Sequence, residues 1–250
     1  MKVGVFKFSS CDGCQLAFFE LEEELLEFSK RLSFEYFLEA SSKNTWEHFD
    51  IAFVEGSVST PEEEERIRKI RESSDRLVAI GACAVSGGIQ SARNFEDFNF
   101  IFYSVYEKPL SYGVNPLSKP VSDFVKVDFE LRGCPINRDA LKELLLSFLD
   151  NKEPELPAYP VCLECKRRGN VCLPVAYGEP CLGPITRGGC NALCPTFKRG
   201  CYGCYGPVEN PNLNALFEAF KRLGLKEEEI KERLILSFNA FHPHHLRVGL

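Results

Sequence analysis

Twelve cysteines are the residues of this chain that point most directly to chemistry. Four are spread through the first 134 residues, and eight are concentrated between residues 162 and 204. One iron–sulfur cluster is usually held by four thiolates, so twelve cysteines are enough for three clusters. The first residues show no secretory signal, so we expect a cytoplasmic location, where clustered thiols bind metal more often than they form disulfides.

The first four cysteines, Cys11, Cys14, Cys83 and Cys134, each come directly after a predicted strand: the first, the fourth or the fifth. In an open α/β sheet the carboxyl ends of the strands meet at one edge, where ligands bind. We therefore expect these four thiolates to gather at one point. Glycines beside them would let the backbone come close to a bulky ligand. Unrelated core cysteines would instead be expected inside strands or helices.

A flavin mononucleotide is the alternative ligand for such an edge. Phosphate binding needs a loop rich in hydroxyl and amide groups after the first strand. Here that loop carries two cysteines around Asp12, whose charge repels phosphate. The segment 81–88 resembles a phosphate-binding loop only loosely. A cluster is the better interpretation.

The other eight cysteines form two groups by adjacency. The first is Cys162, Cys165, Cys172 and Cys181, and the second is Cys190, Cys194, Cys201 and Cys204. Zinc is the main alternative, because Cys-x-x-Cys pairs are common in zinc sites. One zinc ion would leave four of the eight thiols unexplained. The grouping depends on adjacency alone, so an exchange of one ligand between the groups stays open.

The sequence around these cysteines predicts that the chain has three structural parts. Residues 1–150 alternate short apolar runs with amphipathic helices, which indicates a flavodoxin-like, doubly wound, largely parallel α/β sheet. Residues 151–209 form an irregular Cys-rich part with too few apolar residues to build its own core, so metal is expected to stabilise it. Residues 210–250 predict a short helical C-terminal extension. The expected strands are 3–8, 34–40, 51–55, 77–81 and 125–131, and the expected helices are 15–31, 61–74, 137–149, 210–224 and 226–238.

Composition excludes some classes of partner. A net charge of −6 argues against a nucleic-acid binder, and the longest charge-free apolar run, 77–92, is too short and too rich in glycine to span a membrane. We expect neither nucleic acid nor membrane as a partner. Three histidines near the C-terminus, His242, His244 and His245, have no cysteine or acid at ligand spacing, which is more typical of a solvated or subunit-contact tail.

Taken together, the motifs resemble those of [NiFe] hydrogenase small subunits over about the whole chain. Within that family they are most similar to the delta subunit of archaeal cytosolic sulfhydrogenases, which are NAD(P)-linked. The motifs that carry the resemblance are Cys11-Asp12-Gly13-Cys14, Glu55-Gly56-Ser57, Gly81-Ala82-Cys83, Gly133-Cys134-Pro135, Cys172, Cys181-Leu182-Gly183-Pro184, Gly189-Cys190 and Cys201-Tyr202-Gly203-Cys204.

The resemblance implies an electron-transfer subunit with three [4Fe-4S] clusters and no substrate-converting centre of its own. The implied proximal ligands are the first four cysteines, the distal ligands are the 162–181 group and the medial ligands are the 190–204 group. The implied partners are a hydrogenase large subunit that bears the nickel–iron centre, and flavin- and Fe–S-containing diaphorase-type subunits. An iron–sulfur subunit of the complex I type is one rival, although it lacks the eight-cysteine extension. A zinc-stabilised scaffold protein is the other.

Two departures from the periplasmic members of the family bear on the acceptor. Cys162 stands where they have a histidine ligand, and Cys194 supplies a fourth thiolate that their three-iron medial cluster lacks. Clusters held by thiolates alone carry more negative charge and favour lower potentials. This suits exchange with a nicotinamide pool, which we state as a hypothesis.

Overall fold

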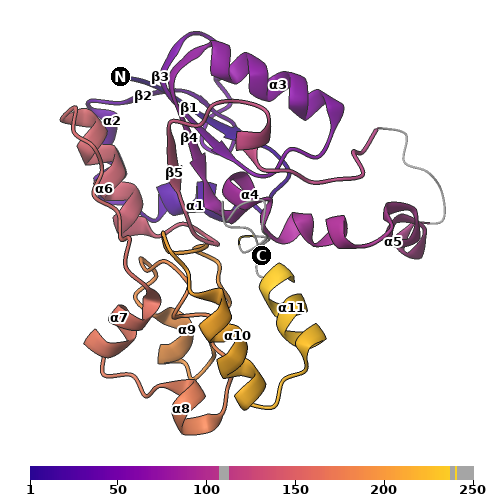
Figure 1. Cartoon of the computed structure of the whole chain (residues 1–250). Coiled ribbons are helices and arrows are strands. Elements are labelled where there is room, and N and C mark those ends of the chain that lie inside the picture. Colours follow the sequence, from indigo (N-terminus) through magenta and orange to yellow (C-terminus); the bar gives the residue numbers. More distant parts are fainter. Residues whose placement is uncertain (107–112, 237–239, 241–250) are drawn as a thin grey trace. The chain divides into compact units, whose positions relative to one another are not determined.

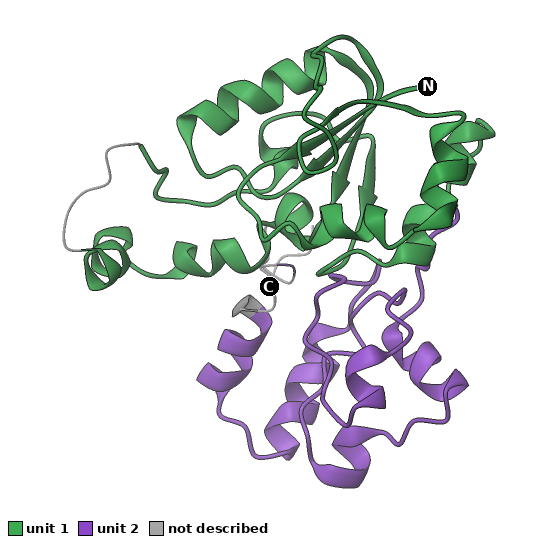
Figure 2. Cartoon of the chain, turned by 180° about the vertical axis from the view of Figure 1, so that it is seen from behind, with its two compact units in different colours: residues 1–154 green, residues 155–250 purple. Residues whose placement is uncertain are grey.

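The chain has two compact units, Met1–Pro154 and Glu155–Leu250 (Figure 2). The structure, a computed structural model, describes residues 1–106, 113–236 and 240. The three C-terminal histidines, His242, His244 and His245, lie outside the described residues. Within the described residues, no helix has both the length and the apolar character that crossing a membrane requires.

The first unit is built on a five-stranded parallel sheet with the order β2-β1-β3-β4-β5 (Figure 1). This is the strand order of flavodoxin-like sheets, so the predicted fold class is confirmed. The strands are β1 (Lys2–Lys7), β2 (Ser33–Phe37), β3 (Phe49–Glu55), β4 (Ser74–Ile80) and β5 (Phe129–Leu131).

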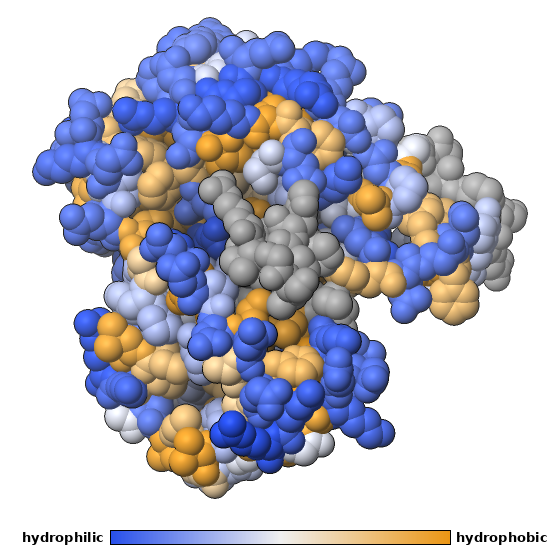
Figure 3. All heavy atoms as spheres, viewed as in Figure 1, coloured by the Kyte–Doolittle hydropathy of each residue, from blue (hydrophilic) through white to orange (hydrophobic). Residues whose placement is uncertain are grey.

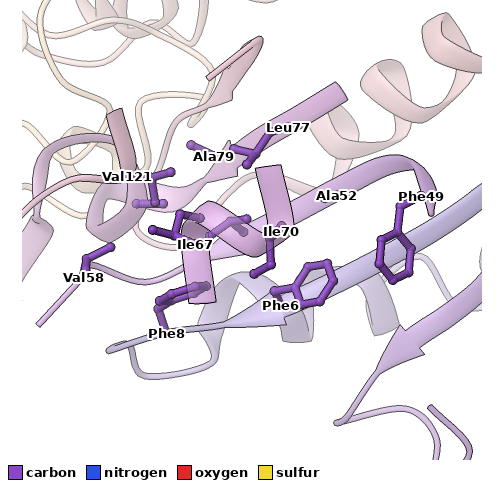
Figure 4. Packing of buried hydrophobic residues seen from close by; sticks show 12 residues of the cluster. Phe6, Phe8, Phe49, Ala52, Val58, Ile67, Ile70, Leu77, Ala79 and Val121 are labelled. Atoms are coloured by element: carbon purple, nitrogen blue, oxygen red, sulfur yellow. The ribbon is translucent and has the colours of Figure 1, made fainter. Parts of the chain in front are cut away.

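Helices pack on both faces of this sheet. The ring of Phe18, in α1, lies 5.3 Å from that of Phe53 in β3. Ile67 and Ile70, in α3, pack against the opposite face in a fully buried cluster with Phe6 (Figure 4). The helices of this unit are α1 (Gly13–Phe19), α2 (Glu23–Ser29), α3 (Pro61–Glu72), α4 (Gly81–Ser86), α5 (Phe98–Val105) and α6 (Arg138–Leu149), with two short 3-10 helices, η1 (Gly88–Phe95) and η2 (Val121–Asp123).

Several predicted boundaries were wrong for local reasons. The helix expected over 15–31 is broken into α1 and α2, because Glu22 has φ 50° and ψ −118°, which no helix contains. The strand expected over 125–131 is reduced to its last three residues, since the amide of Val125 donates back to the carbonyl of Val121 at 3.2 Å and so forms a turn. The strand expected over 34–40 ends at Phe37.

The second unit consists of five helices joined by irregular loops within the described residues. They are α7 (Val161–Arg167), α8 (Leu173–Tyr177), α9 (Leu193–Thr196), α10 (Leu213–Arg222) and α11 (Glu227–Leu236). The Cys-rich segment shares a buried core with the C-terminal helices: Leu182 and Ile185 pack in one cluster with Phe220 and Ile230. Apolar stabilisation that the segment lacks by itself therefore comes from α10 and α11.

Candidate metal centres

Four cysteines from three segments of the chain come together at the carboxyl edge of the sheet. Cys11 follows β1, Cys14 lies in the first turn of α1, Cys83 lies in α4 directly after β4, and Cys134 follows β5. Cys83 is within electrostatic reach of Cys11 and Cys134, and Cys14 is within reach of Cys83 and Cys134. The structure thus brings together the four residues that the sequence assigned to one site.

Two glycines let the backbone lie directly against the sulfur atoms of this group. A Cβ atom on Gly81, which has φ +82°, would lie 2.3 Å from the Sγ atom of Cys14. A Cβ atom on Gly88, which has φ +57°, would lie 2.7 Å from the Sγ atom of Cys83. Any side chain at either position would displace a sulfur, so these glycines are required by the packing around the thiols.

Burial gives these thiols unusual acid–base properties. Burial, with nearby Cys134 and Cys11 thiols, raises the pKa of Cys83 to about 12, and burial with the nearby Glu55 carboxylate raises that of Cys14 well above its ordinary value. Burial also raises the pKa of Cys134. At neutral pH such thiols lose their protons to solvent when a cationic metal centre binds the sulfur, which couples metal binding to proton release.

In the second unit, the first group of cysteines lies around α7 and α8. Cys162 and Cys165 are on α7, Cys172 precedes α8, and Cys181 follows it. Burial raises the pKa of Cys162 to about 11, and thiols of the other three cysteines add to the effect. A Cβ atom on Gly183 would lie 3.3 Å from the Sγ atom of Cys181 and 3.6 Å from that of Cys162. The four residues of this group are therefore neighbours in space.

The second group is less sharply separated. Cys190 interacts with Cys194, and Cys201 interacts with Cys204. However, the amide of Cys201 donates to the Sγ atom of Cys181 at 3.1 Å, and Cys181 also acts on Cys194. Because Cys181 adjoins both groups, the assignment of each of the eight thiols to one group stays a prediction.

The donor set of each group can be tested against the ligand it would hold. All twelve cysteines are free thiols, and thiolates suit iron–sulfur clusters or zinc. Among the described residues, no three Cys, His, Asp or Glu side chains approach closely enough to hold a single metal ion. Zinc–sulfur bonds of about 2.3 Å would require sulfurs about 3.8 Å apart. In a cubane each thiolate binds a separate iron, so the sulfurs stand further apart. Four thiolates are the usual ligand set of an iron–sulfur cluster, so the donor set of each group fits such a cluster.

Comparison with known proteins places the chain in a family. The model of the NADH ubiquinone oxidoreductase 20 Kd subunit family matches residues 11–148. Sulfhydrogenase 2 subunit delta of Pyrococcus furiosus is 39% identical over 94% of this chain and 98% of its own length. The chain belongs to this family, among its hydrogenase small subunits.

Two further proteins support the assignment of this chain to the hydrogenase small subunits. The F420-non-reducing hydrogenase vhu of Methanocaldococcus jannaschii has a subunit that is 32% identical over 82% of this chain and 81% of its own length. A chain of a solved NAD⁺-reducing [NiFe]-hydrogenase superposes with a TM-score of 0.59 at 26% identity, over 63% of this chain and 95% of that chain. The family model ends at residue 148, before the first cysteine of the second unit.

Sequence reasoning about this hydrogenase small subunit missed the role of Glu55. This residue ends β3, and its side chain is buried. Its carboxylate accepts the Cys14 amide at 3.0 Å and the Gln15 side-chain amide at 2.8 Å. Asp12, the residue before α1, provides no side-chain cap. Glu55, at the end of β3, therefore accepts an amide of the first turn of α1 in its place. Burial raises the pKa of Glu55. The signal in the sequence was an acid directly after the apolar run of residues 51–54.

Glu164 has a similar role in the second unit and was also missed. It lies on α7 between Cys162 and Cys165 and is only 5% exposed. Its two carboxylate oxygens accept the amides of Gly189 at 2.6 Å and Ala192 at 2.9 Å. These amides flank Cys190, so Glu164 joins the helix that carries one group of thiols to the loop that carries the other. In the sequence Glu164 stands beside a run of basic residues, which is typical of an exposed segment, so nothing indicated that its side chain is buried.

Proposed function

We propose that this chain relays electrons, through three [4Fe-4S] clusters, between the nickel–iron centre of a hydrogenase large subunit and a flavin- and NAD(P)-linked partner in the cytoplasm. The proposed ligands are those that the family resemblance implies, with four thiolates for each cluster. The chain itself converts no substrate. Its partners would be the large subunit and diaphorase-type subunits that carry flavin and iron–sulfur centres.

The convergence of Cys11, Cys14, Cys83 and Cys134 on one edge of the sheet carries this proposal. Cys83 and Cys134 are distant in sequence from each other and from the Cys11–Cys14 pair, and only the fold brings these three segments together. They occupy the place where open α/β sheets bind ligands. When bound there, a cluster would supply one-electron oxidation and reduction. The chain's own residues hold the site: Glu55 orients the first turn of α1, and Cys14 and Cys83 are buried, whereas Cys11 is exposed.

The eight cysteines of the second unit favour the hydrogenase function over a complex I-type subunit. They lie beyond the 11–148 region that the 20 Kd subunit model covers. The sulfhydrogenase subunit delta, by contrast, aligns with 94% of this chain. A partner that reacts with NAD(P) is supported by the solved relative, which is an NAD⁺-reducing hydrogenase, and by the thiolate character of all twelve expected ligands.

Metal analysis of anaerobically purified protein tests the proposal. We expect about twelve iron ions and matching sulfide per chain, four for each cluster. Cys11→Ser removes one thiolate and should lower the iron content by about four ions per chain. Ser10→Ala is the matched control in the same loop and should retain all the iron. A colourless protein that holds only zinc contradicts the proposal.

A further inference from the structure

Among the four cysteines of the site in the first unit, Cys11 is the one that side-chain packing holds least. It is exposed, whereas Cys14 and Cys83 are buried directly against the backbone of glycines, and Cys134 is half-buried. The position of the Cys11 sulfur therefore depends on the backbone of the loop that follows β1, residues 8–12. Contacts that fix this loop also fix the exposed thiol.

The loop after β1 is joined to the loop after β3. Ser9 and Ser57 exchange two backbone hydrogen bonds, at 3.1 and 3.0 Å, and the Ser57 hydroxyl donates to the Ser9 carbonyl at 3.3 Å. The two loops lie so close together that a Cβ atom on Gly56, which has φ +97°, would be 2.6 Å from the carbonyl carbon of Phe8. Whatever holds Ser57 in place therefore also holds Ser9, two residues before Cys11.

Ser57 belongs to a buried group of three serine hydroxyls. The Ser59 hydroxyl donates to the Oγ atom of Ser118 at 3.1 Å, and the Ser118 hydroxyl donates to the Oγ atom of Ser57 at 2.7 Å. All three serines are buried. Val58 and Lys119 exchange backbone hydrogen bonds of 2.9 and 3.0 Å between the same two segments. The loop after β3 is thus a fixed base for the loop that carries Cys11.

One carboxylate of α3 reaches from this base to the Cys11 loop. The Ser9 hydroxyl donates to Glu63, at 3.1 and 3.3 Å from its two oxygens, and the Ser59 amide donates to the same carboxylate at 2.6 Å. Glu63 is the third residue of α3, and the Thr60 hydroxyl caps this helix. In a capping box the third residue accepts the amide of the cap residue itself. Glu63 instead accepts the amide one residue earlier and also binds Ser9.

Glu63 differs in this respect from the acids beside it on α3. Glu62 and Glu65 are exposed, and Figure 3 shows hydrophilic side chains over the outer face of the region where Figure 1 places α3. On the inner face of the helix, Ile67 packs in one buried cluster with Phe8 (Figure 4). The helix is therefore anchored beside the loop, and its position lets Glu63 act on Ser9 from a rigid element.

We propose that Glu63 is a positioning residue for the site in the first unit and that it acts through the Ser9 hydroxyl to hold the loop that presents Cys11 to a cluster. This inference rests on the proposed function. Residues behind the ligands of a metal site orient those ligands and so tune how firmly the metal is held. Because the Ser59 amide already orients the carboxylate, the bond to Ser9 requires little further ordering of the Glu63 side chain. Without that bond the loop would open more often, and Cys11 would leave its iron more often.

Release of iron from the anaerobically purified full-length chain to a ferrous-iron chelator tests this role. The variants are Ser9→Ala, Glu63→Ala, the double variant of both, and Glu63→Gln. Thr60→Ala is the matched control, because it removes the hydroxyl that accepts the Glu63 amide at 3.1 Å and caps α3, but leaves both partners of the Glu63 carboxylate in place. The thermal unfolding midpoint and the electron paramagnetic resonance spectrum are measured on every variant.

We expect Ser9→Ala and Glu63→Ala to release about four of the twelve expected irons roughly tenfold faster than the wild type, with the other eight unchanged, since a hydrogen bond to a charged group is lost. The double variant should be no faster than Glu63→Ala, because both changes remove the same bond. Glu63→Gln keeps an acceptor oxygen and should stay within about threefold of the wild type. Ser9→Ala should also alter the resonance signal of the site in the first unit without lowering the unfolding midpoint.

The control separates positioning from general stability. Thr60→Ala should lower the unfolding midpoint and leave iron release unchanged. Equal acceleration by Thr60→Ala would overturn the positioning role, and so would additive effects in the double variant or wild-type iron release from Ser9→Ala. If Glu63→Ala does not fold, Ser9→Ala decides the question, because it leaves the bond between Glu63 and the Ser59 amide intact. Wild-type protein without iron–sulfur absorbance would instead refute the proposed function.

Discussion

Removal of the Glu164 carboxylate tests how the second unit holds its cysteines. Glu164→Ala leaves the buried amide of Ala192 and the part-buried amide of Gly189 without a partner. The loop between them is unfavourable by itself, because Asn191 and Ala192, which are not glycines, have positive φ angles. The carboxylate therefore holds a strained loop around Cys190, and the loop should open when the carboxylate is lost.

The magnitude follows from the two hydrogen bonds. An unsatisfied buried amide such as that of Ala192 costs about 1–3 kcal/mol, and the part-buried Gly189 amide adds a smaller cost. Removal of a buried charge relieves its desolvation penalty and offsets part of this cost. We expect a net loss of local stability of about 2 kcal/mol, which corresponds to a roughly thirty-fold larger equilibrium constant for opening of the loop.

Hydrogen–deuterium exchange of the anaerobically purified protein measures this opening directly. Peptides that cover residues 186–196 should exchange about thirty-fold faster in Glu164→Ala, with a smaller change in Glu164→Gln, which can still accept one amide. Glu179→Ala is the control, because Glu179 is an exposed acid of the same unit. Unchanged exchange at residues 186–196 in the alanine variant would refute a structural role for the carboxylate.

Three further predictions concern the packing around the candidate sites and the sheet. Gly81→Ala would place a Cβ atom 2.3 Å from the Sγ atom of Cys14, so the variant should lose about four of the twelve expected irons while the other eight remain, as metal analysis can show. Gly200→Ala would place a Cβ atom 2.0 Å from a backbone carbonyl oxygen, so this variant should lose iron from the second unit. The electron paramagnetic resonance spectrum should then change while the signal of the site in the first unit is preserved. Burial tends to raise the pKa of Asp128, but the hydrogen bond from the Leu77 amide and the charge of a neighbouring arginine outweigh it, so that the pKa lies below its ordinary value. A carboxylate with a lowered pKa stabilises the fold above its unfolded pKa of about 3.9 and loses this contribution as the pH falls through the folded value. Asp128→Asn should therefore lower the thermal unfolding midpoint at neutral pH. The difference in midpoint between the variant and the wild type should shrink below about pH 3.9. A difference that stays constant down to strongly acidic pH would contradict a stabilising role of the ionised carboxylate.

Local patterns in the sequence predicted the architecture of the first unit. Apolar runs of strand length, separated by amphipathic helices, are sufficient to indicate a parallel sheet, because each run must be covered on both faces. The position of Cys83 and Cys134 directly after such runs then predicted a common edge. The break at Glu22 could not be predicted in this way, since the periodicity of apolar residues continues across it while a single φ angle changes.

Tertiary structure alone decided which polar groups support the thiols. Glu55 bonds an amide 41 residues away in the sequence, and Glu164 bonds an amide 28 residues away. No local periodicity encodes such pairs, because they depend on where two loops meet after folding. The same holds for Cys181, which adjacency assigns to one group but which the fold places beside both. The sequence by itself determined the number of thiols and the sheet edge that gathers the first four; long-range packing determined what orients them.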